Sequence, residues 1–104
     1  MTHQPADVEL LERWSRGDQR AGAELVQRHS TALYNFLRWR VPHDLEDIAQ
    51  QTLLACIEQR TGWRGEASFR TYMLSIARYQ VYARYRALKK ARRLAEAQVL
   101  DAPA

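Results

Sequence analysis

The sequence predicts an all-α fold: a compact bundle of about four helices with a long, basic C-terminal helix. Apolar residues recur at helical spacing over most of the 104 residues, and no stretch alternates apolar and polar residues long enough to favour a strand. Four glycines and three prolines leave few points at which a helix must stop. Apolar residues at 46% and charged residues at 27% suit one globular domain with a modest core.

The first two helices are expected over residues 7–16 and 18–40. The first carries apolar residues at helical spacing and ends before a glycine; these residues are Val8, Leu10, Leu11 and Trp14. Asp18 is the expected N-cap of the second helix, which Pro42 terminates. The apolar stripe of this second helix consists of Ala21, Leu25, His29, Leu33, Phe36 and Leu37.

The third helix is expected from Asp44 to about Arg60, with Gly62 available to terminate it. Asp44 is the expected N-cap, and Asp47 follows at the spacing of a capping box. Both acids are favourable near the positive end of the helix dipole. The expected apolar side consists of Ile48, either Thr52 or Leu54, and Leu53, Ala55 and Ile57.

The fourth helix is expected from a Ser68 cap to about Glu96. Its apolar stripe is Phe69, Met73, Ile76, Ala77 and Gln80, continued later by Leu88, Ala91 and Ala95. The stretch from Arg84 to Arg93 is too basic for a core and is expected to project into solvent.

Charge divides the chain into two unlike parts. Residues 1–59 carry six arginines and nine acidic residues, a net charge of −3. Residues 60–93 carry ten basic residues against one acid, a net charge of +9. This asymmetry indicates a polyanion as partner of the second part and a different partner for the first. A solvated basic helix would give the same charge pattern.

Residues for catalysis or metal binding are not apparent, and no cofactor is expected. His3, His29 and His43 share no metal-ligand spacing with one another or with Cys56. Cys56 lies among apolar helix residues, where a buried cysteine is more common than a nucleophile. The chain has neither a signal-peptide pattern nor the roughly 20 consecutive apolar residues of a membrane span. We therefore expect a cytoplasmic, non-enzymatic protein.

An aromatic and basic cluster is the strongest functional signal. It comprises Trp63, Arg64, Phe69, Arg70, Tyr72, Arg78, Tyr79, Tyr82, Arg84, Tyr85 and Arg86. Cations that contact phosphates and flat rings that stack on unpaired bases are what single-stranded nucleic acid requires. Phe69 belongs to the apolar stripe and is expected in the core, Tyr72 could be core or surface, and Tyr79 and Tyr82 lie off the stripe.

Three blocks in order carry a resemblance to region 2 of bacterial sigma factors of the extracytoplasmic-function (ECF) type. The blocks are Asp44-Leu45-Glu46-Asp47-Ile48-Ala49-Gln50-Gln51-Thr52, Arg64-Gly65-Glu66-Ala67-Ser68-Phe69-Arg70-Thr71-Tyr72 and Ile76-Ala77-Arg78. They resemble the family patterns D-A-E-D-L-V-Q-E-T-F, F-R-G-E-A-S-F-R-T-W-L and I-A-R-N. The resemblance extends from about Val8 to Arg93.

The resemblance implies two binding surfaces on one domain of residues 1–96. The third helix would bind the coiled coil of the RNA polymerase beta-prime clamp through Asp47, Gln50, Gln51, Leu53 and Ile57. The loop and fourth helix would capture nontemplate-strand bases of the promoter −10 element and melt it. The implied DNA-binding residues are Trp63, Arg64, Gly65, Glu66, Ala67, Ser68, Arg70, Thr71, Tyr72, Arg78, Tyr79, Tyr82 and Arg86. An anti-sigma factor is a further candidate partner.

Departures from the family pattern leave an alternative open. Gln51 replaces the usual Glu, Ile57 stands where Trp is frequent, and Tyr79 stands where Asn is frequent. The alternative is a sigma-like interaction module that binds polymerase or an anti-sigma factor without reading DNA. Residues 97–104 resemble the start of an interdomain linker, and region 4, which reads the −35 element in complete factors, is absent. We therefore expect a piece of a longer factor, with a natural single-domain protein as the alternative.

Overall fold

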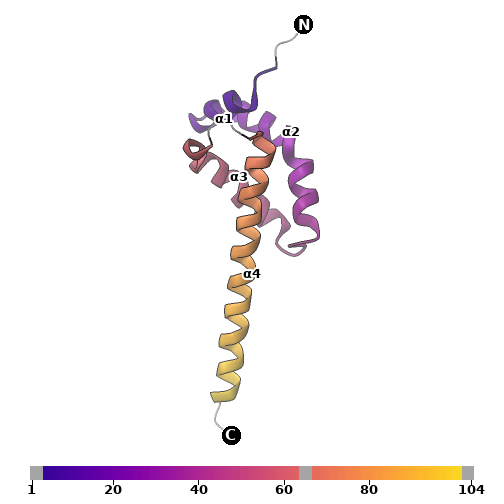
Figure 1. The fold of residues 1–104 in the computed structure, drawn as a ribbon, viewed down its shortest axis with the longest axis vertical. Helices are drawn as coiled ribbons and strands as arrows, with labels where there is room; N and C mark the ends of the chain where they lie inside the picture. Colours follow the sequence, from indigo (N-terminus) through magenta and orange to yellow (C-terminus); the bar gives the residue numbers. More distant parts are fainter. Residues whose placement is uncertain (1–3, 64–66, 102–104) are drawn as a thin grey trace.

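The structure is a computed structural model and describes residues 4–63 and 67–101. Four α-helices and one short 3-10 helix follow one another: α1 (Asp7–Ser15), α2 (Gln19–Arg38), α3 (Leu45–Glu58), η1 (Arg60–Gly62) and α4 (Phe69–Asp101). The first three helices gather around the beginning of α4, and the rest of α4 leaves the bundle as a single rod (Figure 1). The molecule measures 75 × 25 × 25 Å as a result. The predicted all-α bundle of about four helices is confirmed.

Helix α1 buries Leu10 and Leu11, whereas Val8 is 51% exposed. Val8, which the apolar spacing groups with Leu10, Leu11 and Trp14, therefore lies outside the core. Positions 8, 11 and 14 are three residues apart, whereas a helical turn takes 3.6 residues, so their side chains do not all lie on one face of the helix.

The α1–α2 connection has the features that its sequence predicts. Gly17 adopts a φ of +100°, which favours glycine. The Asp18 carboxylate then accepts hydrogen bonds from the backbone N–H groups of Arg20 at 3.1 Å and Ala21 at 3.2 Å. The expected cap is thus confirmed, and these N–H groups lower the pKa of Asp18.

Helices α1 and α2 approach each other closely at Gly22. A Cβ atom at this position would lie 2.4 Å from Nε1 of Trp14. The absence of a side chain therefore allows the Trp14 ring to pack directly on the α2 backbone.

The start of α3 differs from the prediction. Asp44 occupies the N-cap position but makes no side-chain cap hydrogen bond. Its carboxylate instead accepts two hydrogen bonds from Arg84 of α4, at 3.0 and 3.2 Å. The predicted capping by Asp44 was wrong because a guanidinium 40 residues away offers two charge-assisted bonds in place of one backbone N–H.

The remainder of α3 settles the choice between two apolar faces. Thr52 is fully buried and donates its hydroxyl to the carbonyl of Ile48 at 2.8 Å, whereas Leu54 is 51% exposed. The helix ends at Glu58 rather than at Arg60, and η1 follows directly.

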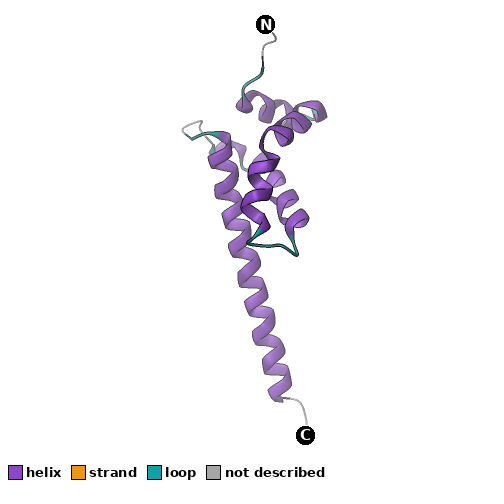
Figure 2. Ribbon diagram, turned by 90° about the vertical axis from the view of Figure 1, so that its right-hand side faces the viewer, coloured by secondary structure: helices purple, strands orange, loops and turns teal. Residues whose placement is uncertain are grey.

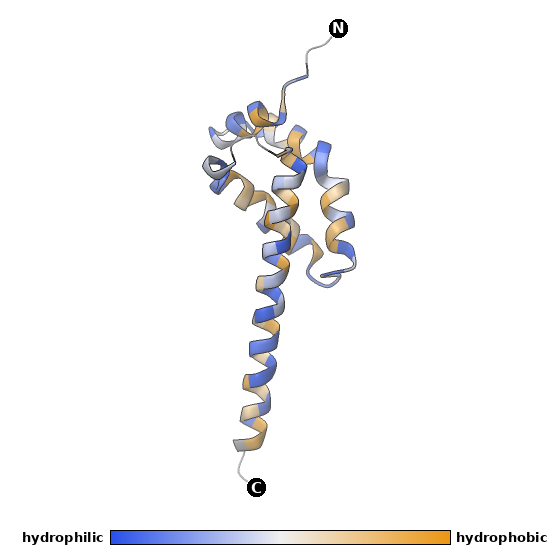
Figure 3. Cartoon of the chain, viewed as in Figure 1, coloured by the Kyte–Doolittle hydropathy of each residue, from blue (hydrophilic) through white to orange (hydrophobic). Residues whose placement is uncertain are grey.

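Helix α4 begins with the expected cap, since Oγ of Ser68 accepts the backbone N–H of Thr71 at 3.1 Å. The helix ends at Asp101, five residues beyond the predicted end at Glu96. Figure 2 shows the free length of the rod, and Figure 3 shows hydrophilic and apolar residues mixed along it. The predicted projection of the basic stretch into solvent is confirmed.

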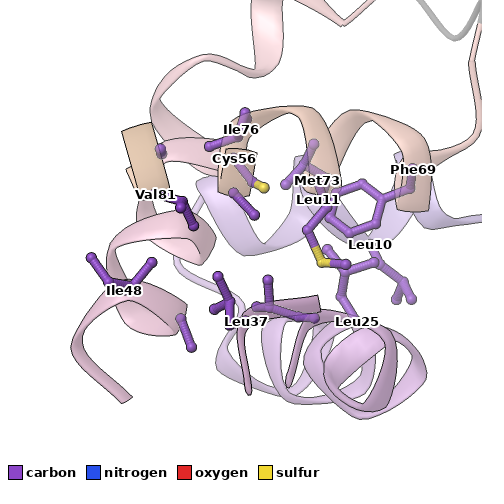
Figure 4. Packing of buried hydrophobic residues seen from close by; sticks show 14 of the residues in the cluster. Leu10, Leu11, Leu25, Leu37, Ile48, Cys56, Phe69, Met73, Ile76 and Val81 are labelled. Carbon is purple, nitrogen blue, oxygen red and sulfur yellow. The ribbon is translucent and has the colours of Figure 1, made fainter. Parts of the chain in front are cut away.

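The core lies between the first half of α4 and the other three helices (Figure 4). Its largest fully buried side chains are Phe69, Leu10, Leu11, Leu25, Leu33, Leu37, Met73, Thr52 and Cys56. Among the described residues, no helix is long and apolar enough to cross a membrane.

Candidate nucleic-acid interface

Trp63, Phe69 and Tyr72 form an aromatic cluster where α4 begins. The Trp63 ring stacks on Tyr72 with a centroid distance of 5.4 Å and meets Phe69 edge-on at 5.6 Å. Its Nε1–H donates to the carbonyl of Ala67 at 2.9 Å. Trp63 thereby ties the two described ends of the segment around residues 64–66 to each other and to the core. Arg64, Gly65 and Glu66, for which a DNA-binding role is predicted, lie outside the described residues.

Tyr72, left open between core and surface, is half-buried and links α4 to α3. Its hydroxyl donates to the carbonyl of Cys56 at 3.0 Å. Burial, with a smaller contribution from Cys56, raises the pKa of Tyr72 to about 12. The phenol therefore remains a proton donor across the physiological range, and only the outer part of the ring is available to a ligand.

Polar side chains surround this cluster at the start of α4. Ala67, Ser68, Arg70 and Thr71 are all exposed. Ser68 uses its hydroxyl to cap the helix and also contacts the Thr71 hydroxyl at 3.1 Å. Arg70 contributes a solvent-facing cation in the first turn.

One side of α4 carries cations and an aromatic ring in a continuous line. Arg78, Tyr82, Arg86, Lys89 and Arg93 are exposed and follow one another at intervals of four, four, three and four residues. These intervals keep side chains on one helical face. We call these five residues the α4 basic face. Tyr79, 61% exposed, lies beside it, so the prediction that Tyr79 and Tyr82 lie off the apolar stripe is confirmed.

Helix α3 presents a second and oppositely charged surface. We call it the α3 acidic face; it consists of the exposed residues Glu46, Asp47, Gln50, Gln51, Leu54 and Glu58. Gln51 lies 3.4 Å from the Asp47 carboxylate, and the Tyr34 hydroxyl donates to Glu46 at 2.9 Å. That hydrogen bond raises the pKa of Tyr34.

The predicted polymerase-binding residues fall on or beside the α3 acidic face. Asp47, Gln50 and Gln51 are exposed members of it. Leu53 and Ile57 are half-buried against the core. Leu54, in the middle of the face, was missed, although its position seven residues after Asp47 would have placed it there.

The described residues provide neither an ionised cysteine nor a group of metal ligands. Cys56 is fully buried, and burial raises the pKa of its thiol to about 12, which keeps it un-ionised. No three His, Cys, Asp or Glu side chains of the described residues are grouped to hold a metal ion.

Comparison with protein families gives one match that covers most of the chain. The family described as Sigma-70 region 2 matches residues 25–93. The match includes α3, the α4 basic face and the aromatic cluster between them.

Curated relatives are similar over 78 residues. The chain is 31% identical to the ECF RNA polymerase sigma-E factor of Haemophilus influenzae, over 74% of this chain and 41% of that protein. It is 36% identical to the RNA polymerase sigma factor NccH of Alcaligenes xylosoxydans xylosoxydans, over 73% of this chain and 42% of that one. The chain thus spans about two fifths of the length of these relatives.

One solved structure has the same fold. It is an NMR structure of an engineered region 2 of sigmaE in complex with GTAAAA, with a TM-score of 0.64 and 24% identity. The superposition covers 98% of this chain and 100% of the other.

Proposed function

The chain belongs to the sigma-70 region 2 family and is similar to ECF sigma factors, and we propose that it binds promoter DNA and RNA polymerase through separate surfaces in transcription initiation. The α4 basic face and the aromatic cluster at its start would contact the nontemplate strand of the −10 element. The α3 acidic face would contact the beta-prime clamp coiled coil.

The observation that carries the DNA assignment is the unbroken line of cations and exposed tyrosine along α4. Single-stranded DNA binds where cations follow its phosphates and aromatic rings stack on its bases. The α4 basic face offers four cations and Tyr82 with no acid among its members. The matched structure, whose described ligand is the strand GTAAAA, has the same fold, which supports this ligand class.

Base capture would use the loop and the aromatic cluster. The family resemblance assigns capture of an unstacked base to the segment from Trp63 to Ser68, and extruding a base costs a few kcal/mol. The outer part of the Tyr72 ring, stacked on Trp63, supplies a platform beside that segment. Arg70 and Arg78, both exposed on α4, would contact the adjoining phosphates.

Neutralising two cations of the α4 basic face tests the DNA assignment. The Arg78→Gln/Arg86→Gln double variant should bind a fluorescein-labelled single DNA strand about tenfold more weakly at low salt, because two phosphate contacts are lost. Fluorescence anisotropy measures the affinity. Arg16→Gln/Arg20→Gln removes two exposed arginines elsewhere and is the matched control. Equal losses in both double variants would refute the assigned surface.

The polymerase assignment has its own test. Asp47→Arg reverses a charge on the α3 acidic face and should weaken binding to the isolated beta-prime coiled coil by about tenfold or more. Glu9→Arg, an exposed substitution on α1, is the control. Unchanged binding of the Asp47→Arg variant would exclude the α3 acidic face as the docking surface.

The alternative, an interaction module that binds polymerase without reading DNA, differs in the result expected for DNA. Asp47→Arg would then abolish polymerase binding, while the α4 double variant would behave like its control on DNA. The exposed apolar Leu54 within the α3 acidic face favours a protein partner there under either reading.

A further inference from the structure

A small cavity opens between the end of α2 and the middle of α4. It has a volume of about 230 Å³. Six residues line it: Phe36, Arg40, Arg78, Val81, Tyr82 and Tyr85. Arg78 and Tyr82 also belong to the α4 basic face, so the cavity lies at the edge of the surface proposed for DNA.

The Arg40 guanidinium forms a fixed wall of this cavity. Its carbon lies 3.9 Å from the centroid of the Phe36 ring, and Nη1 donates to the Phe36 carbonyl at 2.6 Å. The Tyr85 hydroxyl donates in turn to the Arg40 carbonyl. Stacking and one hydrogen bond therefore hold the guanidinium in place before any ligand arrives, which reduces the entropy lost on binding, while the Tyr85 hydroxyl fixes the Arg40 backbone.

The charge of the cavity favours an anion. Of the described residues, two arginines and no acidic residue line it. The Asp44 carboxylate, in the α2–α3 turn, is paired with Arg84, from which it accepts two hydrogen bonds. An arginine has five N–H donors, and Arg40 uses one of them in the hydrogen bond to the Phe36 carbonyl, so donors remain for a phosphate or a base edge.

The shape of the lining favours a flat ligand. Tyr82 is 60% exposed and Tyr85 46% exposed, and the buried Val81, which directly precedes Tyr82 in the chain, adds an apolar side chain to the lining. Nucleobases stack on tyrosine rings and on arginine guanidinium planes. A flat apolar face with adjacent negative charge is the chemistry of a nucleotide.

We propose that the α2–α4 cavity takes one unstacked base of a DNA single strand, with Arg40 and the tyrosines as its walls. This inference rests on the proposed function and adds a base site separate from the loop of residues 63–68. Phe36, on α2, and Arg40, two residues beyond the end of α2, become part of the DNA surface. The strand would pass from the α4 basic face onto the C-terminal end of α2.

The test compares a strand that has bases with one that lacks them. Fluorescein-labelled oligo(dT) and an abasic strand of equal length carry the same phosphates, so their difference in affinity reports base contacts. At low ionic strength, Arg40→Gln should weaken oligo(dT) binding about tenfold. On the abasic strand, Arg40→Gln should match Arg20→Gln, which removes one exposed arginine of α2 outside the cavity.

A second variant removes the Phe36 ring, on which the Arg40 guanidinium stacks, without changing the charge of the protein. Phe36→Leu should weaken binding of oligo(dT) and leave binding of the abasic strand unchanged, because only the aromatic support of Arg40 is lost. Circular dichroism melting checks that this variant is folded; if it is not, the Arg40→Gln comparison decides.

The outcomes separate this inference from the function on which it rests. If the unaltered chain binds neither strand, the DNA function itself is wrong. If it binds oligo(dT) but Arg40→Gln weakens both strands equally, Arg40 is a phosphate contact and the base site is refuted. If Arg40→Gln is indistinguishable from Arg20→Gln on both strands, the cavity has no part in binding and the inference is refuted.

Discussion

The first half of α4, residues 69–84, packs against α2 and α3, whereas every residue from 85 to 100 is exposed. The packed half buries Phe69, Met73, Ile76, Ala77 and Val81. The free half has no buried residue between positions 85 and 100, although the Tyr85 hydroxyl at its start donates to the Arg40 carbonyl. It nevertheless continues the same helix for about five further turns. One helix thus obtains its stability from tertiary contacts at one end and from local preference at the other.

Composition explains how the free half persists. Residues 87–97 are without exception strong helix formers: Ala87, Leu88, Lys89, Lys90, Ala91, Arg92, Arg93, Leu94, Ala95, Glu96 and Ala97. Starting a helix is the costly step, and the packed half has already done it. Each added residue then needs only favourable propagation, which these residues supply.

The largest difference between the two halves is expected in the free energy of unfolding when a side chain is truncated in each half. Met73→Ala removes a fully buried side chain and should lower the free energy of unfolding by about 2–5 kcal/mol. Leu88→Ala in the free half should change it by less than about 0.5 kcal/mol. Urea denaturation of both variants measures this. A large loss for Leu88→Ala would mean that the free half packs against a second molecule in solution.

The ion pair at the boundary between the halves should contribute an intermediate amount to the free energy of unfolding. Arg84 is the last residue of the packed half, and its side chain, 40% exposed, is paired with Asp44, 28% exposed. A double-mutant cycle of Asp44→Asn and Arg84→Gln should give a coupling energy of about 0.5–1 kcal/mol, because solvent screens a partly exposed pair. A coupling energy of zero in urea denaturation would mean that the pair does not anchor α4.

Charge removal in the free half should change DNA binding and leave stability nearly unchanged. Lys89→Gln/Arg93→Gln should alter the free energy of unfolding by less than about 0.5 kcal/mol. The same variant should reduce the slope of log K against log salt for single-stranded DNA by about 1.4, since each phosphate contact contributes about 0.7. The Arg16→Gln/Arg20→Gln variant is the control. An unchanged slope would restrict the DNA surface to the part of α4 that precedes Lys89.

Local sequence predicted the helices and most of the core. The α2 stripe and the Asp18 cap are features of neighbouring residues, and both are as expected. The α4 end was underestimated because no glycine or proline follows Glu96 until Pro103, so nothing in residues 97–101 stops the helix. The observed end of α4 at Asp101 follows helix propensity. The predicted end at Glu96 was based on the apolar side of the helix, which stops at Ala95.

Contacts between elements could not be predicted in the same way. Asp44 has the sequence context of a cap, and only the three-dimensional packing brings Arg84 beside it. The α2–α4 cavity likewise joins Phe36 and Arg40 to residues about 40 positions later. For the candidate site, the exposed tyrosines of α4 were predictable from periodicity, but the partners that fix Trp63 and Tyr72 were not.

The unbroken α4 also sets an angular relation between its two halves. A helix turns about 100° per residue, so one residue inserted after Ala87 would rotate Lys89 and Arg93 by about 100° from the line of Arg78 and Arg86. Seven inserted residues would shift the same cations about 10 Å along the axis and only about 20° around it. Helical phase, as well as charge, therefore decides whether the distal cations can face the same strand as the proximal ones.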